Sequence, residues 1–336
     1  MPIGSGVMLQ AALQGWLALG GIQAAAALAA YAILVVLLVV AFDYAFGWAE
    51  RKTLAAIQSR RGPTRAGGYG LLQNFADITK LLSKEDATPR AAGSFAFKAS
   101  LLLMPAAFVF LVMLLPLSPG SIGGGLSLGL LAVFVVLCFV PSLVFVCGFS
   151  SGNKFAEISA QRTVVSQLGY GMPMVIVAAT VAMLAGTYGL QGIVAAQAGA
   201  WYALLMPLGF AVFFVALLAS LGKAPLDAGE TDSELAAGWL TDVSAPYYAL
   251  ALFADYARMF LGGLLVSILF LGGWLGPVLP PVVWLLIKAF VVLLCITVVR
   301  AALASMRIDR ILRFGWVALV PLAALNLIIV LMLFIR

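Results

Sequence analysis

The sequence contains no histidine among its 336 residues, which excludes several kinds of catalytic and metal site. Without imidazole there is no bis-histidine haem, no histidine-ligated metal and no Ser-His-Asp triad. Cys138, Cys147 and Cys295 lie in apolar runs without CxxC spacing, and we interpret them as small hydrophobic residues. We therefore expect no metal site and no covalently bound cofactor, so a partner must hold any redox centre.

Glycine-rich phosphate-binding motifs are also missing. Gly67-Gly68 and Gly123-Gly124-Gly125 have neither GxGxxG nor Walker spacing. The net charge of +6 does not indicate nucleic acid as a partner, because basic loops serve membrane topology and attract anionic headgroups.

Long apolar runs dominate what is present. The chain is 64% hydrophobic and 10% charged, and its mean hydropathy is +1.13. A run of about 20 apolar residues is long enough to cross a bilayer as a helix. We find eight such runs, near residues 25–46, 98–117, 127–149, 163–187, 200–221, 246–271, 280–304 and 314–335. These runs predict an all-α polytopic membrane protein, with about eight spans in a single integral domain covering residues 1–336.

The charged residues fall in alternate gaps between these runs, so the gaps after the second, fourth and sixth runs contain none. By the positive-inside rule the charged side is cytoplasmic, and an even number of spans puts both termini on the opposite side. We expect a multi-pass protein of a prokaryotic inner membrane. The stretch before Ala25 lacks a basic segment, so we expect no cleavable signal peptide. The first charged gap, residues 47–98, carries nine of the 19 basic residues: Arg51, Lys52, Arg60, Arg61, Arg65, Lys80, Lys84, Arg90 and Lys98.

This first gap combines a basic turn with an amphipathic helix. Arg60, Arg61 and Arg65 accompany Gly and Pro in a segment typical of a shaped turn, although a generic basic loop is the alternative. Leu71, Phe75, Ile78 and Leu82 then recur at helical spacing, opposite Gln73, Asp77, Lys80 and Lys84. The stretch is too short to span, so we expect a helix in the plane of the membrane interface.

The gap at residues 222–245 reverses the sign of charge, because five acidic residues accompany only Lys223. On a helix Asp227, Glu230 and Glu234 would share one face, and such crowding favours proton uptake near neutral pH. A merely solvated acidic loop is the alternative. The remaining acidic residues of this gap are Asp232 and Asp242.

Ionisable residues also occur within the apolar runs. Such groups face a protein interior, pair with each other or line a wet path. Asp255 and Arg258 are three apart on one helix and are expected to pair, whereas Asp43 and Lys288 are either intramembrane sites or residues that reach an interface. Arg300 lies near the end of the seventh run.

Several separated motifs resemble the quinone-site membrane subunit of respiratory complex I. Glu50-Arg51-Lys52 and Gln58 to Arg65 resemble the family's ER…QxRxGPNRxG signature, and Gly70 to Leu81 is similar to its GLLQPxADxxKL helix. The resemblance continues to about Asn326 through these further segments: Ser151 to Phe155 with Arg162, Ala224 to Asp227, Asp232 to Gly238, and Arg300, Arg307, Asp309, Arg310 and Trp316.

The resemblance implies a proton-translocating NADH-quinone oxidoreductase-type complex, with lipid quinone as substrate. The expected partners are other membrane subunits and soluble iron–sulfur subunits, and no residue of this chain is expected to be catalytic by itself. The residues implied for the quinone cavity and for partner docking are Glu50, Arg51, Arg60, Arg61, Arg65, Gln73, Asp77 and Lys80. Those expected to couple proton movement are Asp227, Glu230, Asp232, Glu234, Asp255 and Asp43.

Three positions depart from the family pattern. Gly171 and Ser220 stand where the family usually has glutamates of its buried carboxylate path, and Asp255 replaces a usual Glu. This drift suggests a divergent branch with another donor module, of the F420H2 or ferredoxin type. Two alternatives stay open: the membrane anchor of an energy-converting hydrogenase, and a secondary transporter with a midplane ion site.

Overall fold

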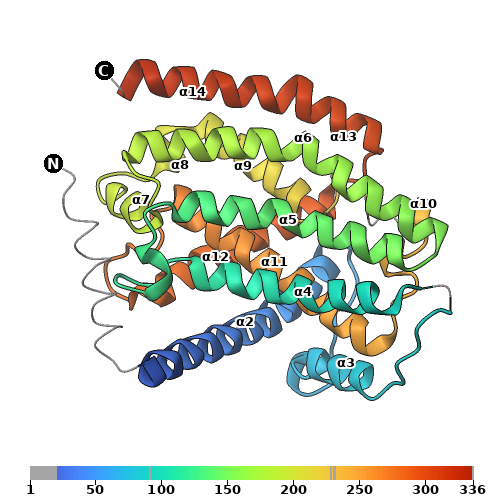
Figure 1. Cartoon of the computed structure of the whole chain (residues 1–336). Helices are drawn as coiled ribbons and strands as arrows, with labels where there is room; N and C mark the ends of the chain where they lie inside the picture. The colour runs from blue at the N-terminus through green and yellow to red at the C-terminus, as the bar shows by residue number, and fades with distance from the viewer. Residues whose placement is uncertain (1–20, 91, 228, 230–231, 335–336) are drawn as a thin grey trace.

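The computed structural model describes residues 21–90, 92–227, 229 and 232–334. These residues form helices and no strands (Figure 1). The segment before Gly21, where we expected no signal peptide, lies outside this range. The α-helices are α2 (Gly21–Ile57), α3 (Gln73–Leu82), α4 (Ser94–Leu114), α5 (Gly129–Ser150), α6 (Lys154–Ala185), α7 (Leu190–Ala196), α8 (Tyr202–Leu205), α9 (Pro207–Ser220), α10 (Asp232–Leu235), α11 (Ala245–Phe270), α12 (Pro281–Ala302), α13 (Ile308–Phe314) and α14 (Val320–Phe334). Short 3-10 turns are η1 (Gly68–Gly70), η2 (Ile122–Gly125) and η3 (Gly238–Leu240), and η4 (Gly315–Leu319) is a π-helical turn.

Seven of these helices are long and apolar enough to cross a membrane, by length and composition, which confirms the all-α polytopic prediction. They are the apolar part of α2 from Ala25, then α4, α5, α6, α11, α12 and the continuous stretch from α13 through α14.

The fifth predicted span, residues 200–221, is the exception. Its helix is interrupted at Met206, where the backbone has φ −134° and ψ 69°, and α9 is only 14 residues long. Pro207 explains the break, because proline has no N–H and disfavours the helical conformation in the residue before it. The expectation of one continuous helix over this run is therefore wrong.

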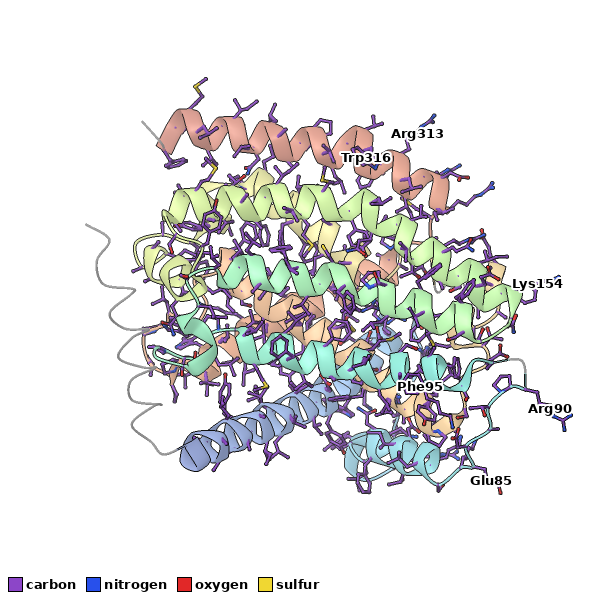
Figure 2. The ribbon with its side chains drawn as sticks, viewed as in Figure 1. Glu85, Arg90, Phe95, Lys154, Arg313 and Trp316 are labelled. Atoms are coloured by element: carbon purple, nitrogen blue, oxygen red, sulfur yellow. The ribbon has the colours of Figure 1, made fainter. Side chains whose placement is uncertain are left out.

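The charged gaps come together at one end of the bundle. Successive spanning helices run in alternate directions, so the connections that follow α2, α5, α9 and α12 lie at the same end (Figure 1). Glu85, Arg90 and Lys154 mark this charged end in Figure 2. The alternation of charged and uncharged gaps in the sequence thus corresponds to two chemically different ends of the molecule.

Helix α11 lies at the centre of the bundle, with 72% of its apolar segment buried, against 17% for α2. Small residues allow this close packing: a Cβ on Gly262 would lie 3.1 Å from the Leu217 side chain, and one on Gly263 would lie 3.0 Å from the Ala289 carbonyl. Because α11 contacts α2, α3, α4 and α12, its polar residues can meet partners from several elements.

The basic turn is folded tightly against the start of α3. Gly70 has φ +79°, and a Cβ there would lie 2.2 Å from the Pro63 carbonyl oxygen, so only glycine fits. Helix α2 continues past residue 47 to Ile57, so the first charged gap begins within this helix. Glu50 and Arg51 therefore project from a helix, which fixes their direction relative to α3.

Candidate functional site

Helix α3 is fastened to α2 by side chains from both elements. The Tyr44 hydroxyl donates to the Leu71 carbonyl at 2.5 Å, and the Asn74 amide donates to the Tyr44 carbonyl at 3.0 Å. Arg51 Nη1 lies 2.6 Å from Asp77 Oδ2, and Gln73 donates to the other oxygen of Asp77 at 2.9 Å. The structure thus brings Arg51, Gln73 and Asp77, three of the residues implied for the quinone cavity, into one network.

The carboxylate of Asp77 is held in its charged form by this network. Burial acts to raise the pKa of Asp77, but hydrogen bonds from Arg51 and Gln73 outweigh it and hold the pKa below its usual value. The contact between α3 and α2 is thus an ionic one at neutral pH.

The opposite face of α3 is apolar and exposed. Phe75 is 61% exposed and Leu82 59% exposed, and Leu71 and Ile78 are also exposed. This pattern fits a helix that lies in the membrane interface with its apolar face in lipid. Exposure of these four side chains is what the helical periodicity predicted.

A cavity of about 110 Å³ lies between α2, α3 and α11, and we call it the outer cavity. Asp43 is 8% exposed, and in the described part of the chain neither of its carboxylate oxygens has a hydrogen-bond partner. A buried carboxylate without a partner is costly, so its position in a cavity wall is a candidate functional feature. The cavity is lined by Val40, Asp43, Tyr44, Arg51, Asn74, Asp77, Ile78, Leu81, Ala249, Leu252, Phe253 and Tyr256.

A larger central cavity, of about 320 Å³, lies on the other side of α11. Leu252 borders both cavities. Apolar side chains from α4 and α5 form one wall of the central cavity. Its polar lining consists of Lys223, Trp239, Tyr248, Asp255, Arg258 and Arg300.

Asp255 lies between two cations in the wall of the central cavity. Arg258 Nη2 is 2.9 Å from Asp255 Oδ1, which confirms the local pair expected from their spacing. Lys223 Nζ is 2.6 Å from Asp255 Oδ2, a contact that sequence reasoning missed. Arg258 also donates to the Leu221 carbonyl at 2.8 Å, so this cluster ties the end of α9 to α11.

Glu50 and Arg300 form a second interior ion pair. Their side chains meet at 2.7 Å, and the Glu50 side chain is 5% exposed while that of Arg300 is 37% exposed. The two residues are 250 positions apart, so no local pattern in the sequence could have paired them. The bond joins α2 to α12 beside the central cavity.

The acidic loop is not the helix that we expected. Asp227 lies outside any helix, and α10 covers only Asp232–Leu235, so the prediction of one helical face for Asp227, Glu230 and Glu234 is wrong. The proline and glycine residues of this segment favour turns over a continued helix. Glu230 lies outside the described residues, and so does the side chain of Asp232.

Glu234 is engaged with α6. Arg162 Nη1 lies 2.5 Å from Glu234 Oε2, and the Ser159 hydroxyl donates to the Gly229 carbonyl at 2.5 Å. The acidic loop is thereby held against the charged end of α6, next to the central cavity.

The three arginines of the basic turn are exposed, as is Lys80. Arg60 donates to the Gln58 side chain at 2.7 Å. Within the described residues, Arg60, Arg61 and Arg65 form no ion pair with the acidic loop. Their charges therefore face outward at the charged end of the molecule.

Lys288 of α12 binds backbone carbonyls of the segment that follows α11. Its ammonium group donates to the carbonyls of Leu271, Gly273 and Leu275 at 2.7, 2.9 and 2.8 Å. It thus holds the chain that follows α11, where helix-end carbonyls need donors.

The chain matches the family described as NADH dehydrogenase over residues 28–331. It belongs to that family. The H subunit of NADH-quinone oxidoreductase from Dehalococcoides mccartyi is 35% identical over 302 residues, which cover 88% of this chain and 85% of the relative. The H subunit of F(420)H(2) dehydrogenase from Methanosarcina acetivorans is 36% identical over 300 residues, which cover 84% of this chain and 86% of that relative. Relatives named for two different donors are thus about equally similar.

Gly171 and Ser220, two of the three positions at which the resemblance implied a different residue, line one small cavity of about 50 Å³. Gly171 comes from α6 and Ser220 from the end of α9, and Arg258 also borders this cavity. The small and central cavities share Arg258 together with Phe108, Val140 and Val144. Arg258, the partner of Asp255, therefore borders both the small and the central cavity.

Proposed function

We propose that this chain is the quinone-site membrane subunit of a proton-translocating, complex I-like oxidoreductase. Membership of the NADH dehydrogenase family and the names of its relatives support this proposal. The observation that carries it is the outer cavity, whose wall is formed by an interfacial helix with an exposed apolar face.

In this proposal a lipid quinone passes from the bilayer beside α3 and reaches the outer cavity. Its apolar tail packs against Ile78, Leu81 and Phe253, and its polar head approaches the charged end, where Arg51 and Asp77 lie. The quinone is the substrate, and partner subunits supply the electrons.

The charged end would face the cytoplasm and bind the soluble iron–sulfur subunits. Arg60, Arg61, Arg65 and Lys80 are exposed there and suit docking to carboxylates of a partner, since guanidinium groups bind carboxylates in a bidentate geometry. Other membrane subunits would cover part of the apolar helix faces.

Coupling to proton movement is assigned to the carboxylates of the interior. Asp43 and Asp255 line the outer and central cavities, and Glu234 holds the acidic loop against α6. Asp227, Glu230 and Asp232 belong to the same proposed group through their place in the acidic loop. Reduction of a quinone consumes protons, so a change of charge in the cavities would act on these groups.

The test is a bulky substitution in the wall of the outer cavity. Leu81→Trp should slow reduction of a long-tailed quinone at least fivefold while slowing that of a short, water-soluble analogue less than twofold. Leu82→Trp is the matched control, because Leu82 is 59% exposed and does not line the cavity. Equal slowing with both quinones in Leu81→Trp, with the complex intact on a native gel, would contradict the proposed path.

A further inference from the structure

The last spanning segment carries arginines at the end of an exposed apolar face. Helices α13 and α14 form an outer layer of the bundle next to α6 (Figure 1). Residues about one turn apart on the inner side of this layer are buried against α6 and α9, namely Ile311, Gly315, Leu319, Ala323 and Asn326. The outer side is exposed and consists of Phe314, Trp316, Val317, Leu325, Ile328, Met332 and Leu333.

Three arginines lie where this exposed face reaches the charged end. Arg307, Arg310 and Arg313 are exposed, and Asp309 is the one acidic residue among them, so this segment has a net charge of +2. Among the described residues, none of the three arginines forms an ion pair. Figure 2 shows Arg313 pointing away from the bundle. The arginines that do pair with carboxylates elsewhere in the structure are Arg51, Arg162, Arg258 and Arg300.

The length of the helix places these arginines at a definite depth in a membrane. From Phe314 to Phe334 the chain is helical and predominantly apolar, and this stretch rises about 30 Å along the helix axis. The hydrocarbon core of a bilayer has the same thickness. With the stretch in that core, Arg310 and Arg313 lie at the level of the lipid phosphates. Trp316 then lies in the interfacial belt that tryptophan prefers.

We propose that Arg310, Arg313 and Trp316 bind an anionic phospholipid such as phosphatidylglycerol. The three residues follow one another at intervals of three, so they are neighbours on the helix surface. The guanidinium groups donate planar pairs of hydrogen bonds to the phosphate, and the acyl chains lie along Val317 and the exposed residues that follow it.

Charge and shape together select this ligand. A zwitterionic lipid brings its own ammonium group, so the net charge of +2 favours an anionic one. A soluble phosphate would satisfy the arginines but would leave the apolar face uncovered. Because Arg310, Arg313 and Trp316 line none of the outer, central and small cavities, the site goes beyond the proposed function and does not depend on it.

The test uses lipids with brominated acyl chains, which quench the fluorescence of a tryptophan that they touch. The full chain is reconstituted in phosphatidylcholine vesicles that contain a small fraction of either brominated phosphatidylglycerol or brominated phosphatidylcholine. The signal of Trp316 is the difference between a chain and its Trp316→Phe counterpart. We expect brominated phosphatidylglycerol to quench this signal at least threefold more strongly than brominated phosphatidylcholine at the same mole fraction.

Two double variants separate this site from the general charge of the surface. Arg310→Gln combined with Arg313→Gln should abolish the preference for phosphatidylglycerol. Arg90→Gln combined with Lys154→Gln is the matched control, because it removes two exposed positive charges at the same end of the molecule (Figure 2). The control should keep the preference within 1.5-fold of wild type.

Three results would each overturn the proposal: a wild-type chain without the preference, an Arg310 and Arg313 double variant that keeps it, or a control that also loses it. Should the double variant fail to insert into vesicles, the single variants Arg310→Gln and Arg313→Gln replace it. Each single variant should lose at least half of the preference, and single variants equal to wild type would overturn the proposal. Inorganic phosphate should have no more effect than sodium chloride of equal ionic strength, and a specific loss in phosphate would assign the site to a soluble anion.

The assembled complex tests whether a lipid or another subunit covers this face. Phe314 is 41% exposed beside the arginines, and p-benzoylphenylalanine introduced in its place forms a covalent bond on irradiation with whatever lies against it. We expect the mass of the chain to rise by that of one phospholipid. A cross-link to another subunit would overturn the assignment to a lipid.

Discussion

Replacement of Glu50 by glutamine should destabilise the folded chain through the loss of its pair with Arg300. The Glu50 side chain is 5% exposed, and its oxygen lies 2.7 Å from Arg300. Breaking a fully buried pair costs about 3–5 kcal/mol, whereas exposed pairs contribute about 0–1 kcal/mol. Because the Arg300 side chain is 37% exposed, we expect an intermediate loss of about 2 kcal/mol, or about 30-fold in the unfolding equilibrium.

The assay is SDS-induced unfolding of the purified chain in mixed micelles, followed by tryptophan fluorescence. A double-mutant cycle with Arg300→Gln isolates the pair, and the double variant should be little less stable than either single variant. Asp86→Asn is the control, because Asp86 pairs with Lys98 at the surface and should matter less. A Glu50→Gln chain within about 0.5 kcal/mol of wild type, or strictly additive effects, would refute the reasoning.

Two further predictions concern the ends of the bundle. The pKa of Asp77 lies below its unfolded value, so its contribution to holding α3 is present above about pH 4 and is lost as the pH falls through the folded pKa. The rate of amide hydrogen exchange in α3, corrected for the intrinsic rates, should therefore rise in the wild-type chain as the pH is lowered. In the Asp77→Asn variant the amides of α3 should exchange faster than in wild type already at neutral pH. Lys288→Met leaves three carbonyls without their donor and should cost about 2 kcal/mol in the SDS assay. Lys154→Met is its exposed control, and equal stability of the two variants would count against the capping role of Lys288.

The sequence by itself determined the features that depend on residues close to each other along the chain. Apolar length and charge alternation predicted a helical membrane protein with one charged end, because a spanning helix must satisfy its own backbone hydrogen bonds. The spacing of Leu71, Phe75 and Ile78 predicted the exposed apolar face of α3, and the spacing of Asp255 and Arg258 predicted their pair. In each case the interacting residues lie within one or two helical turns.

The tertiary structure decided the rest. Glu50 meets Arg300, and Lys223 meets Asp255, only because α11 and α12 pack beside distant parts of the chain. Helix packing also placed Gly171 of α6 and Ser220 of α9 in the wall of one cavity, whose shape the sequence does not specify. Interior charges must find partners in a low-dielectric core, but which partners they find depends on how the helices are arranged, and helix periodicity alone does not specify that arrangement.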